Sequence, residues 1–343
     1  MTAVPGIDLP AAQAHFGAVL GCDPSSISFS LIAGGRSNLT YLMSAGGRDL
    51  VLRRPPLGHV LPSAHDMGRE YRVISALYGT AVRVPEPIAA AGADNPLGWP
   101  YFVMARVAGS VVSNAAAARE LTPDQARRAS VSLVEQLVAI HTVDLDAIGL
   151  ADLGRPAGFM ARQVKRWLEQ WRASGGVETG LPMERLGAGV LESLPPTAST
   201  GLVHGDYRLD NTILAADDPG RVAAVIDWEM ATLGDPLADL GVFATYWDPV
   251  TEPLTGGGHA MDANPGFPDT ATLLRMYEDA CGRSLGPISP YVAFGHFKLA
   301  AIAQTIAARH DQGLTVGEQF AAAAGVVPEL VHGGLAVLAA GES

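Results

Sequence analysis

The residues best suited to catalytic chemistry lie near the middle of the chain, where an apolar run is followed by polar side chains. Residues 202–211 read LVHGDYRLDN, which places Asp206 five positions before Asn211. A second apolar run, residues 222–226, ends at Asp227. Phosphoryl transfer requires a carboxylate that accepts a proton and hard oxygen ligands for Mg²⁺. The three side chains predict chemistry of this kind if neighbouring strands bring them together.

Each of these residues also has a simpler explanation, because Asp and Asn favour turns. Their spacing argues for more than turns. In the kinase catalytic loop an Asp is followed five positions later by an Asn, and a metal-binding Asp comes after a later strand. Asp206, Asn211 and Asp227 repeat this order. We expect His204, two positions before Asp206, to orient the loop rather than touch substrate.

The elements that must position these residues fall into two parts. Residues 25–106 contain short alternating segments, including a predicted hairpin with a glycine turn, and residues 107–343 contain mostly helical patterns. A short helix is expected within residues 1–24. We therefore predict an α+β chain with a small β-rich N-terminal lobe and a larger helical C-terminal lobe. A cleft between such lobes is where small molecules usually bind.

Capping signals predict where several helices begin. Asp8 starts the first helix, residues 63–66 have capping-box form, and Thr122 starts a long amphipathic helix. We expect Asp235 and Asp239 to be structural, since they lie in a Gly-Asp-Pro segment that opens a helix. Their predicted task is to cap that helix and to tie down the catalytic loop.

The chain resembles the aminoglycoside phosphotransferase family, a small-molecule branch of the protein-kinase-like fold, over nearly its whole length. It is most similar to the subfamily whose kinase domains are also fused to acyl-CoA dehydrogenases. The stretches that carry the resemblance are GGRSN at 34–38, VLRRPP at 51–56, IDWE at 226–229, GDPLADL at 234–240 and FKLA at 297–300. The resemblance implies a bilobal kinase-like fold, ATP and Mg²⁺ as cofactors, and phosphate transfer to a small-molecule hydroxyl.

The resemblance also implies roles for single positions. Asp206 would be the catalytic base, and Asn211 and Asp227 would be the Mg²⁺ ligands. Arg208 would offset charge on the transferring phosphoryl group. Alternatively, Arg208 forms a salt bridge with Asp210 or another carboxylate of the loop.

For the nucleotide, the resemblance points to the glycine turn, where backbone N–H groups approach phosphates, although an ordinary Gly-Gly hairpin looks the same. Ser37 and Asn38 would add hydrogen bonds to phosphate or simply close that turn. Met104 and Ala105 would pair with the adenine or be ordinary strand residues. The expected nucleotide-binding set is Gly34, Gly35, Ser37, Asn38, Arg53, Glu70, Met104 and Ala105.

One departure from the family pattern concerns the lysine expected on the third strand, where the chain has Arg53. This arginine would pair the nucleotide phosphates and Glu70. Lys165 and Lys298 are the only lysines, so no other lysine of the small lobe can substitute. Arginine is not a neutral exchange for lysine, yet its planar fork can bridge phosphate and carboxylate. A non-catalytic, nucleotide-binding pseudokinase therefore stays open as an alternative.

The acceptor must be inferred from the helical lobe. Lys298 and Arg309 lie eleven residues apart, so they share one face of a predicted helix. Two cations on an apolar face favour an anionic acceptor, such as a hydroxy acid or a hydroxyacyl thioester, unless they pair with Glu278 or Asp279. An aminoglycoside or another antibiotic is the alternative acceptor. Residues 247–268 lack periodicity and are expected to form a lid, a binding loop or a disordered segment.

Composition limits the remaining function classes. With 23 Lys and Arg against 35 Asp and Glu, the net charge of −12 argues against binding nucleic acid or a membrane surface. Two cysteines cannot build a disulfide scaffold. The N-terminus lacks the features of a signal peptide, and no apolar run is long enough to predict a membrane-spanning helix. We expect a cytoplasmic enzyme, monomeric or homodimeric, whose partner is a small-molecule acceptor.

Overall fold

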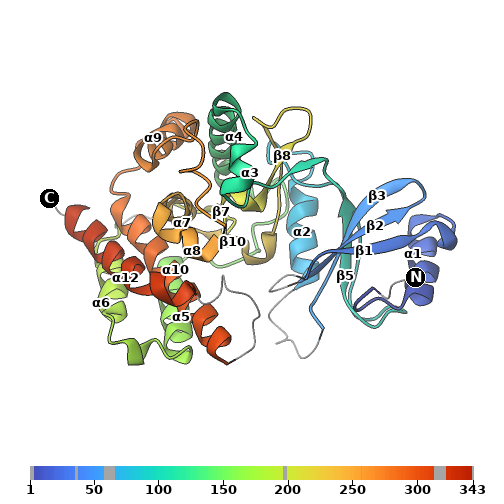
Figure 1. The fold of residues 1–343 in the computed structure, drawn as a ribbon, viewed down its shortest axis with the longest axis horizontal. Coiled ribbons are helices and arrows are strands. Elements are labelled where there is room, and N and C mark those ends of the chain that lie inside the picture. Colours follow the sequence, from blue (N-terminus) through green and yellow to red (C-terminus); the bar gives the residue numbers. More distant parts are fainter. Residues whose placement is uncertain are drawn as a thin grey trace. The chain divides into compact units, whose positions relative to one another are not determined.

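The computed structural model combines an antiparallel sheet in the N-terminal part with a largely helical C-terminal part, as the α+β prediction requires (Figure 1). By contacts, the chain divides into two compact units. Unit 1 comprises Met1–Ala108 together with Ala224–Ala231, and unit 2 comprises Gly109–Ala223 together with Thr232–Ser343. The structure describes residues 4–34, 38–57, 66–195, 199–255, 257–312 and 322–341.

Unit 1 is built on a five-stranded antiparallel sheet with the order β1-β2-β3-β5-β4. The alternation of apolar and polar residues explains this sheet, because every second residue of β2 from Tyr41 onward is buried. The expected hairpin is confirmed by the pairing of β1 with β2, and the third strand ends just before Pro55, as predicted. The strands are β1 (Ser28–Gly34), β2 (Leu39–Ala45), β3 (Arg48–Arg54), β4 (Pro87–Ala91) and β5 (Tyr101–Ala105).

Two helices complete unit 1. Helix α1 (Leu9–Leu20) is capped by Asp8, as predicted, and buries Phe16 in the core formed with the sheet. Helix α2 (Met67–Leu77) begins after Asp66, whose carboxylate accepts the N–H of Arg69 at 3.0 Å. The other residues of the predicted capping box lie outside the described residues. Helix α2 packs against β4, β5 and the short turn η4 (Trp228–Met230).

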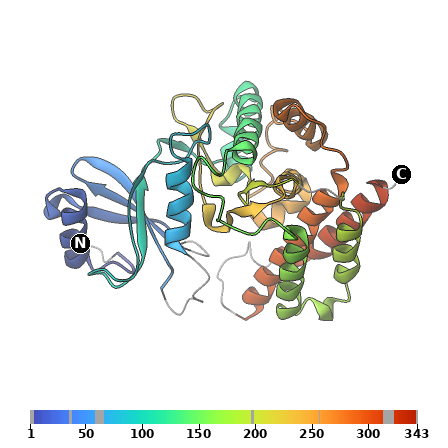
Figure 2. The ribbon, with the colours of Figure 1, turned by 180° about the vertical axis from the view of Figure 1, so that it is seen from behind.

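Unit 2 is mainly helical, and its long helix α10 contacts α5, α6, α7 and α12 (Figure 2). Its helices are α3 (Ala115–Arg119), α4 (Pro123–Thr142), α5 (Phe159–Ala173), α6 (Met183–Glu192), α7 (Pro236–Tyr246), α8 (Glu252–Thr255), α9 (Thr270–Cys281), α10 (Ser289–Asp311) and α12 (Ala323–Gly341). Its strands and shorter turns are β6 (Gly109–Ser110), η2 (Val177–Thr179), β7 (Gly201–Val203), η3 (Leu209–Asn211), β8 (Thr212–Ala215), β10 (Thr232–Gly234) and η5 (Pro249–Thr251). The boundary between the units divides β9 (Val222–Val225).

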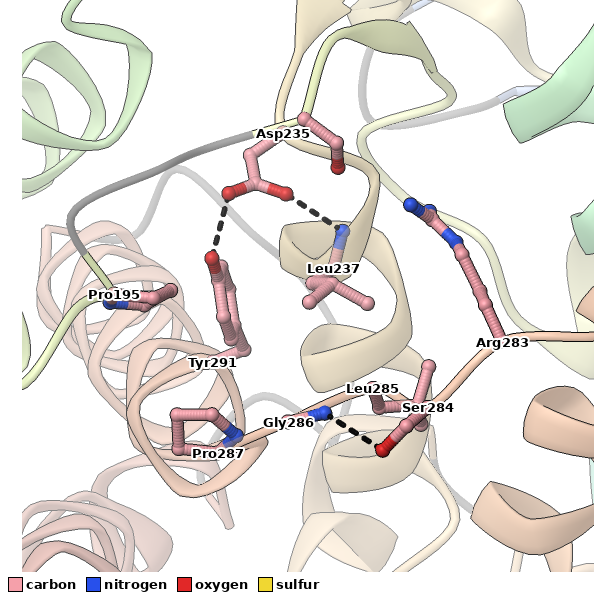
Figure 3. A pocket seen from close by; sticks show the side chains of 10 residues that line it. Pro195, Asp235, Leu237, Arg283, Ser284, Leu285, Gly286, Pro287 and Tyr291 are labelled. Carbon is pink, nitrogen blue, oxygen red and sulfur yellow. Dashed lines mark hydrogen bonds between the residues drawn. The ribbon is translucent and has the colours of Figure 1, made fainter.

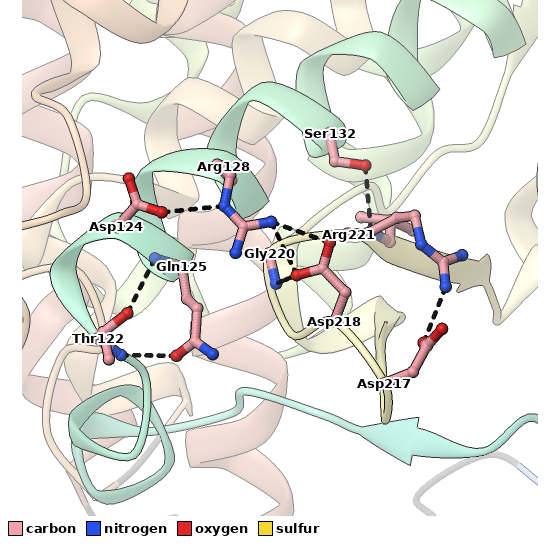
Figure 4. A network of polar contacts seen from close by, with 10 residues as sticks. Thr122, Asp124, Gln125, Arg128, Ser132, Asp217, Asp218, Gly220 and Arg221 are labelled. Carbon is pink, nitrogen blue, oxygen red and sulfur yellow. Dashed lines mark hydrogen bonds and ion pairs between the residues drawn. The ribbon is translucent and has the colours of Figure 1, made fainter.

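The start of α4 is fixed by capping and by ion pairs (Figure 4). Thr122 and Gln125 form a reciprocal capping box. One turn further on, Arg128 binds Asp218 at 2.7 Å and Asp124 at 3.1 Å, which ties the helix to the turn between β8 and β9. The predicted start of this helix is thus confirmed.

For residues 247–268, the expectation of a disordered segment is wrong in the described part, whereas the lid and the binding loop stay predictions. This segment contains η5 and α8 and is packed on unit 2, with Phe267 buried. The buried Asn264 side chain donates to the carbonyl oxygens of Ala118 at 2.9 Å and Leu121 at 2.8 Å. Such contacts to distant backbone leave no periodic pattern in the sequence.

Helix α12 corrects a second expectation. Among the described helices it is the one that is long and apolar enough to cross a membrane by length and composition. The sequence reading passed over it because Glu329 and His332 interrupt its apolar run. In the structure, 39% of its most apolar window is buried, and α12 packs along α10. Buried core helices share this composition.

A close approach between α7 and α10 provides a test of this packing. A Cβ atom at Gly241 would lie 2.0 Å from the carbonyl oxygen of Tyr291, so Gly241→Ala must separate the two helices. We expect it to lower the free energy of unfolding by about 3 kcal/mol. Urea denaturation measures the change. In the control Gly325→Ala the new Cβ meets nothing within 4 Å, and that variant should be neutral or gain up to about 1 kcal/mol. Equal stability of both variants would contradict the packing described.

Candidate active site

The segment that joins β7 to β8 forms a closed loop around Asp206. Gly205 has a φ of +88°, a left-handed conformation that favours glycine. Asn211 closes the loop, because its Nδ2 donates to the Asp206 carbonyl oxygen at 2.8 Å and to Asp206 Oδ2 at 3.0 Å. The N–H of Asp206 donates to His204 Nδ1 at 3.2 Å, so His204 orients the loop as expected. The five-residue spacing therefore brings Asp206 and Asn211 into contact.

A single buried carboxylate, that of Asp239 in α7, holds the start of this loop. It accepts the backbone N–H groups of His204 at 2.6 Å and Gly205 at 2.9 Å. Its Oδ2 also lies 3.4 Å from His141 Nε2. Burial alone would raise the pKa of Asp239, but these hydrogen bonds and the two histidines lower it below its usual value. The predicted tie between Asp239 and the catalytic loop is confirmed.

The other aspartate of the Gly-Asp-Pro segment fixes the helix that carries Asp239 (Figure 3). Asp235 accepts the N–H of Leu237 at 3.1 Å and the hydroxyl of Tyr291 at 2.6 Å, which confirms its predicted capping role. Asp235 and Tyr291 also line a cavity of about 390 Å³ that Arg283 borders. None of residues 204–211 lines this cavity.

The carboxylate of Asp206 is held from three sides. Besides Asn211, the Tyr246 hydroxyl donates to its Oδ1 at 3.2 Å, and Arg208 Nε lies 3.5 Å from its Oδ2. Burial would raise the pKa of Asp206, but Arg208, Lys298 and His204, together with the Asn211 amide, lower it. Its neighbours therefore favour the ionised form of Asp206. Sequence reasoning missed Tyr246, because nothing distinguishes this tyrosine within the apolar helix α7.

Arg208 forms the predicted salt bridge, and its role toward the phosphoryl group stays a prediction. Its Nε lies 3.0 Å from Asp210 Oδ1, so the predicted alternative, a salt bridge within the loop, is present. Its guanidinium also lies 4.9 Å from the centre of the Tyr246 ring. The side chain thus stays beside Asp206 while it is paired with Asp210.

Lys298 is buried and therefore does not form a surface cationic face together with Arg309. This corrects the expectation that the two residues present such a face. The lysine is 3% exposed, and its Nζ donates to the carbonyl oxygen of Gly205 and lies 5.6 Å from the Trp167 ring centre. Burial lowers its pKa, against the opposing effect of Asp206 and Asp239. Arg309 is exposed on the same helix, about 16 Å further along the axis at 1.5 Å per residue. The periodicity argument failed because α10 is buried on most of its faces.

Unit 1 contains a second charged cluster. Arg53 donates from Nη1 to Glu70, as predicted, and from Nη2 to Asp227 Oδ1 at 3.2 Å. Asp227 has a φ of +67° and is the one non-glycine residue at positive φ among those the structure describes. Non-glycine residues adopt this left-handed conformation rarely, although aspartate does so more readily than most. The planar fork of arginine suits two carboxylates better than a single ammonium group does.

The charges of this cluster depend on one another. Burial raises the pKa of Glu70 to about 7, although Arg53 opposes the shift. Burial would lower the pKa of Arg53, but Glu70, Asp227 and Glu229 together raise it. Glu229 also accepts the side-chain N–H of Asn38 at 3.1 Å. Glu229 is a site residue that sequence reasoning missed, although it lies in the IDWE stretch beside Asp227.

The structure places the other expected nucleotide residues as follows. Gly34 ends β1, while Gly35 and Ser37 lie outside the described residues. Met104 and Ala105 are in β5, and the N–H of Ala105 donates to the carbonyl oxygen of Glu86 at 2.8 Å. The Ala105 N–H is therefore used in a hydrogen bond within the chain. A hydrogen bond between Ala105 and an adenine would have to use the carbonyl oxygen of Ala105.

The oxygen atoms of Asn211 and Asp227 suit Mg²⁺, which needs few protein ligands. They suit less well a metal whose ligands all come from the protein. Across the described part of the chain, no three His, Cys, Asp or Glu side chains group closely enough to hold an ion. Mg²⁺ commonly takes only one or two protein oxygens and completes its shell with phosphates and water. Asn211 uses its Nδ2 on Asp206, which leaves the amide oxygen for other partners, and the Asp227 side chain is 31% exposed. Asn211 belongs to unit 2 and Asp227 to unit 1.

Comparisons with known proteins identify relatives of the chain. Acyl-CoA dehydrogenase family member 11 of Pongo abelii is 32% identical to the chain, over 91% of the chain but 40% of that protein. The chain thus spans about 40% of the length of this relative. A crystal structure from Ralstonia eutropha, assigned to the aminoglycoside phosphotransferases, is 30% identical with a TM-score of 0.79 and covers 96% of this chain and 98% of its own.

A more distant structure shows the fold alone. Aminoglycoside phosphotransferase APH(4)-Ia, in a ternary complex with AMP-PNP and hygromycin B, is 17% identical with a TM-score of 0.62 over 94% of this chain and 98% of its own. These neighbours identify the kinase-like fold. The sequence pattern of the phosphotransferase enzyme family matches residues 28–271. The chain therefore belongs to the phosphotransferase enzyme family.

Proposed function

We propose that the chain is an ATP- and Mg²⁺-dependent kinase that transfers the γ-phosphate of ATP to a hydroxyl group of a small molecule. The observation that carries this proposal is the carboxylate of Asp206, which Asn211 and Tyr246 hold within a loop of kinase spacing. The complex of APH(4)-Ia with AMP-PNP supports a nucleotide as the phosphate donor.

In the proposed reaction Asp206 acts as the catalytic base. The acceptor oxygen forms a bond to the γ-phosphorus while the bond from that phosphorus to the bridging oxygen of ADP breaks. The acceptor proton passes to the Asp206 carboxylate, which its neighbours keep ionised beforehand. Arg208, 3.5 Å from Asp206, offsets negative charge on the transferring phosphoryl group.

The remaining charged residues would hold the nucleotide and the metal. Arg53 contacts the phosphates from its position between Glu70 and Asp227. Mg²⁺ would neutralise negative charge on the nucleotide phosphates in a reaction of this type. Asn211 and Asp227 are its proposed protein ligands, since each offers an oxygen of the type that Mg²⁺ prefers.

The proposed acceptor is a hydroxy acid or a hydroxyacyl thioester. The support comes from the relative named acyl-CoA dehydrogenase, because enzymes joined in one chain often act on related compounds. The cationic face of Lys298 and Arg309 no longer supports an anionic acceptor. The net charge of −12 supports action on a small molecule rather than on nucleic acid or a membrane. We further propose that the enzyme is cytoplasmic and is a monomer or a homodimer.

Replacing the base tests the proposal. Asp206→Asn should lower phosphate transfer about 10²–10⁴-fold, because general base catalysis contributes a factor of this size. Transfer is measured from labelled Mg-ATP into a pool of hydroxy acids, hydroxyacyl thioesters, aminoglycosides and macrolides. The control Asp217→Asn removes a carboxylate that is 80% exposed and should leave the rate unchanged. If the wild type binds ATP but labels no compound and releases no phosphate, the pseudokinase alternative replaces the proposal.

Replacing Arg53 tests the charged cluster of unit 1. Arg53→Met should lower the free energy of unfolding by about 3–5 kcal/mol at pH 8.5, because it leaves the buried Glu70 carboxylate without its cation. The loss should be smaller at pH 6. The raised pKa of Glu70, about 7, lets the carboxyl take up a proton there and lose its charge.

Denaturant titrations of wild type and variant at the two pH values measure this difference. Arg53→Lys is the matched control, since it keeps a cation but lacks the planar fork that reaches Glu70 and Asp227 together. It should lose less stability than Arg53→Met and raise the KM for ATP. A loss in Arg53→Met that is independent of pH would show that Glu70 is not the group responsible.

A further inference from the structure

A small cavity adjoins the catalytic loop in unit 2. Its volume is about 30 Å³, and its polar walls are Arg208, Asp210, Tyr246 and His259, with Ser113 at the edge. A water molecule needs about 10–15 Å³ measured in this way, so the cavity holds a group of one or two non-hydrogen atoms.

Two walls of the cavity touch the proposed catalytic base. Tyr246 donates its hydroxyl to Asp206 Oδ1 at 3.2 Å, and Arg208 Nε lies 3.5 Å from Asp206 Oδ2. The cavity is therefore one side chain away from the atom that would accept the substrate proton. A molecule whose reacting hydroxyl lies at Asp206 places its neighbouring atoms beside this cavity.

The fourth polar wall is a buried histidine whose Nε2 has no partner among the described residues. His259 is 8% exposed, and within the described residues neither of its ring nitrogens has a hydrogen-bond partner. Its backbone is well fixed, since the preceding Gly258 donates its N–H to Glu252 at 3.0 Å and accepts the N–H of Ala115 at 3.1 Å. A buried polar group without a partner destabilises a protein, so such a group calls for a ligand.

The surroundings of His259 favour one form of its ring. Nδ1 lies 3.4 Å from Asp262 Oδ2, which favours a proton on Nδ1. With a single proton on Nδ1, the Nε2 lone pair is an acceptor that requires a donor.

We propose that this cavity is an acceptor subsite in which His259 accepts a hydrogen bond from a second hydroxyl group of the substrate. This inference rests on the proposed kinase function and narrows its acceptor to a dihydroxy compound whose second hydroxyl is close to the phosphorylated one. A hydroxyl is the smallest donor, and its size matches the cavity. His259 thus determines specificity without taking part in the transfer itself.

The kinetic test compares two acceptors that differ by one hydroxyl, glycerate and lactate, with labelled Mg-ATP as donor. The wild type should show a kcat/KM for glycerate at least tenfold above that for lactate. His259→Phe keeps an aromatic ring but removes both nitrogens, and it should bring the ratio close to one. His259→Gln restores an oxygen acceptor and should recover part of the preference. His332→Phe, on the exposed face of α12, is the control and should keep the wild-type ratio.

A measurement on the wild type does not depend on variants that fold. In a ¹⁵N-histidine NMR spectrum, assigned with the His259 variants, Nδ1 should carry the proton and Nε2 should not. A proton on Nε2 overturns the inference, and so does a wild type that turns over ATP without preferring glycerate. A wild type that neither hydrolyses ATP nor labels an acceptor defeats the proposed function itself, and the inference falls with it.

Discussion

Two consecutive backbone N–H groups, those of His204 and Gly205, point at one buried carboxylate, and the geometry around Asp206 depends on this contact. The carboxylate of Asp239 fixes the direction of the chain as it leaves β7. The left-handed Gly205 then turns its carbonyl oxygen toward Lys298. A buried anion and a buried cation thus hold opposite sides of the same peptide segment, and each reduces the cost of burying the other.

The charged cluster of unit 1 is also held by buried groups of opposite charge, but there the central group is a cation. There one arginine lies between two carboxylates, and the group under backbone constraint is itself an aspartate, Asp227. Both clusters keep their ionised groups in place before a ligand arrives. Such preorganisation lowers the reorganisation needed when charge moves during phosphoryl transfer.

Much of this arrangement could be predicted from sequence, because local signals carry it. The caps at Asp8 and Thr122 are short-range hydrogen bonds, and the contact of Asp206 with Asn211 is set by five residues of chain. What could not be predicted depends on tertiary burial. The spacing of Lys298 and Arg309 describes a helix with a solvent-facing side, whereas α10 is surrounded by other helices.

The segment Ala224–Ala231 belongs to unit 1, although more than a hundred residues separate it from the rest of that unit. It brings Asp227 to Arg53, and its Ala231 carbonyl oxygen accepts the Arg69 side chain at 2.9 Å. A recombinant chimera that exchanges only the first 108 residues with those of a relative would therefore pair a foreign sheet with a native aspartate. Among homologues, substitutions in these eight residues should therefore correlate with substitutions in the N-terminal part of the chain more than with substitutions in their sequence neighbours.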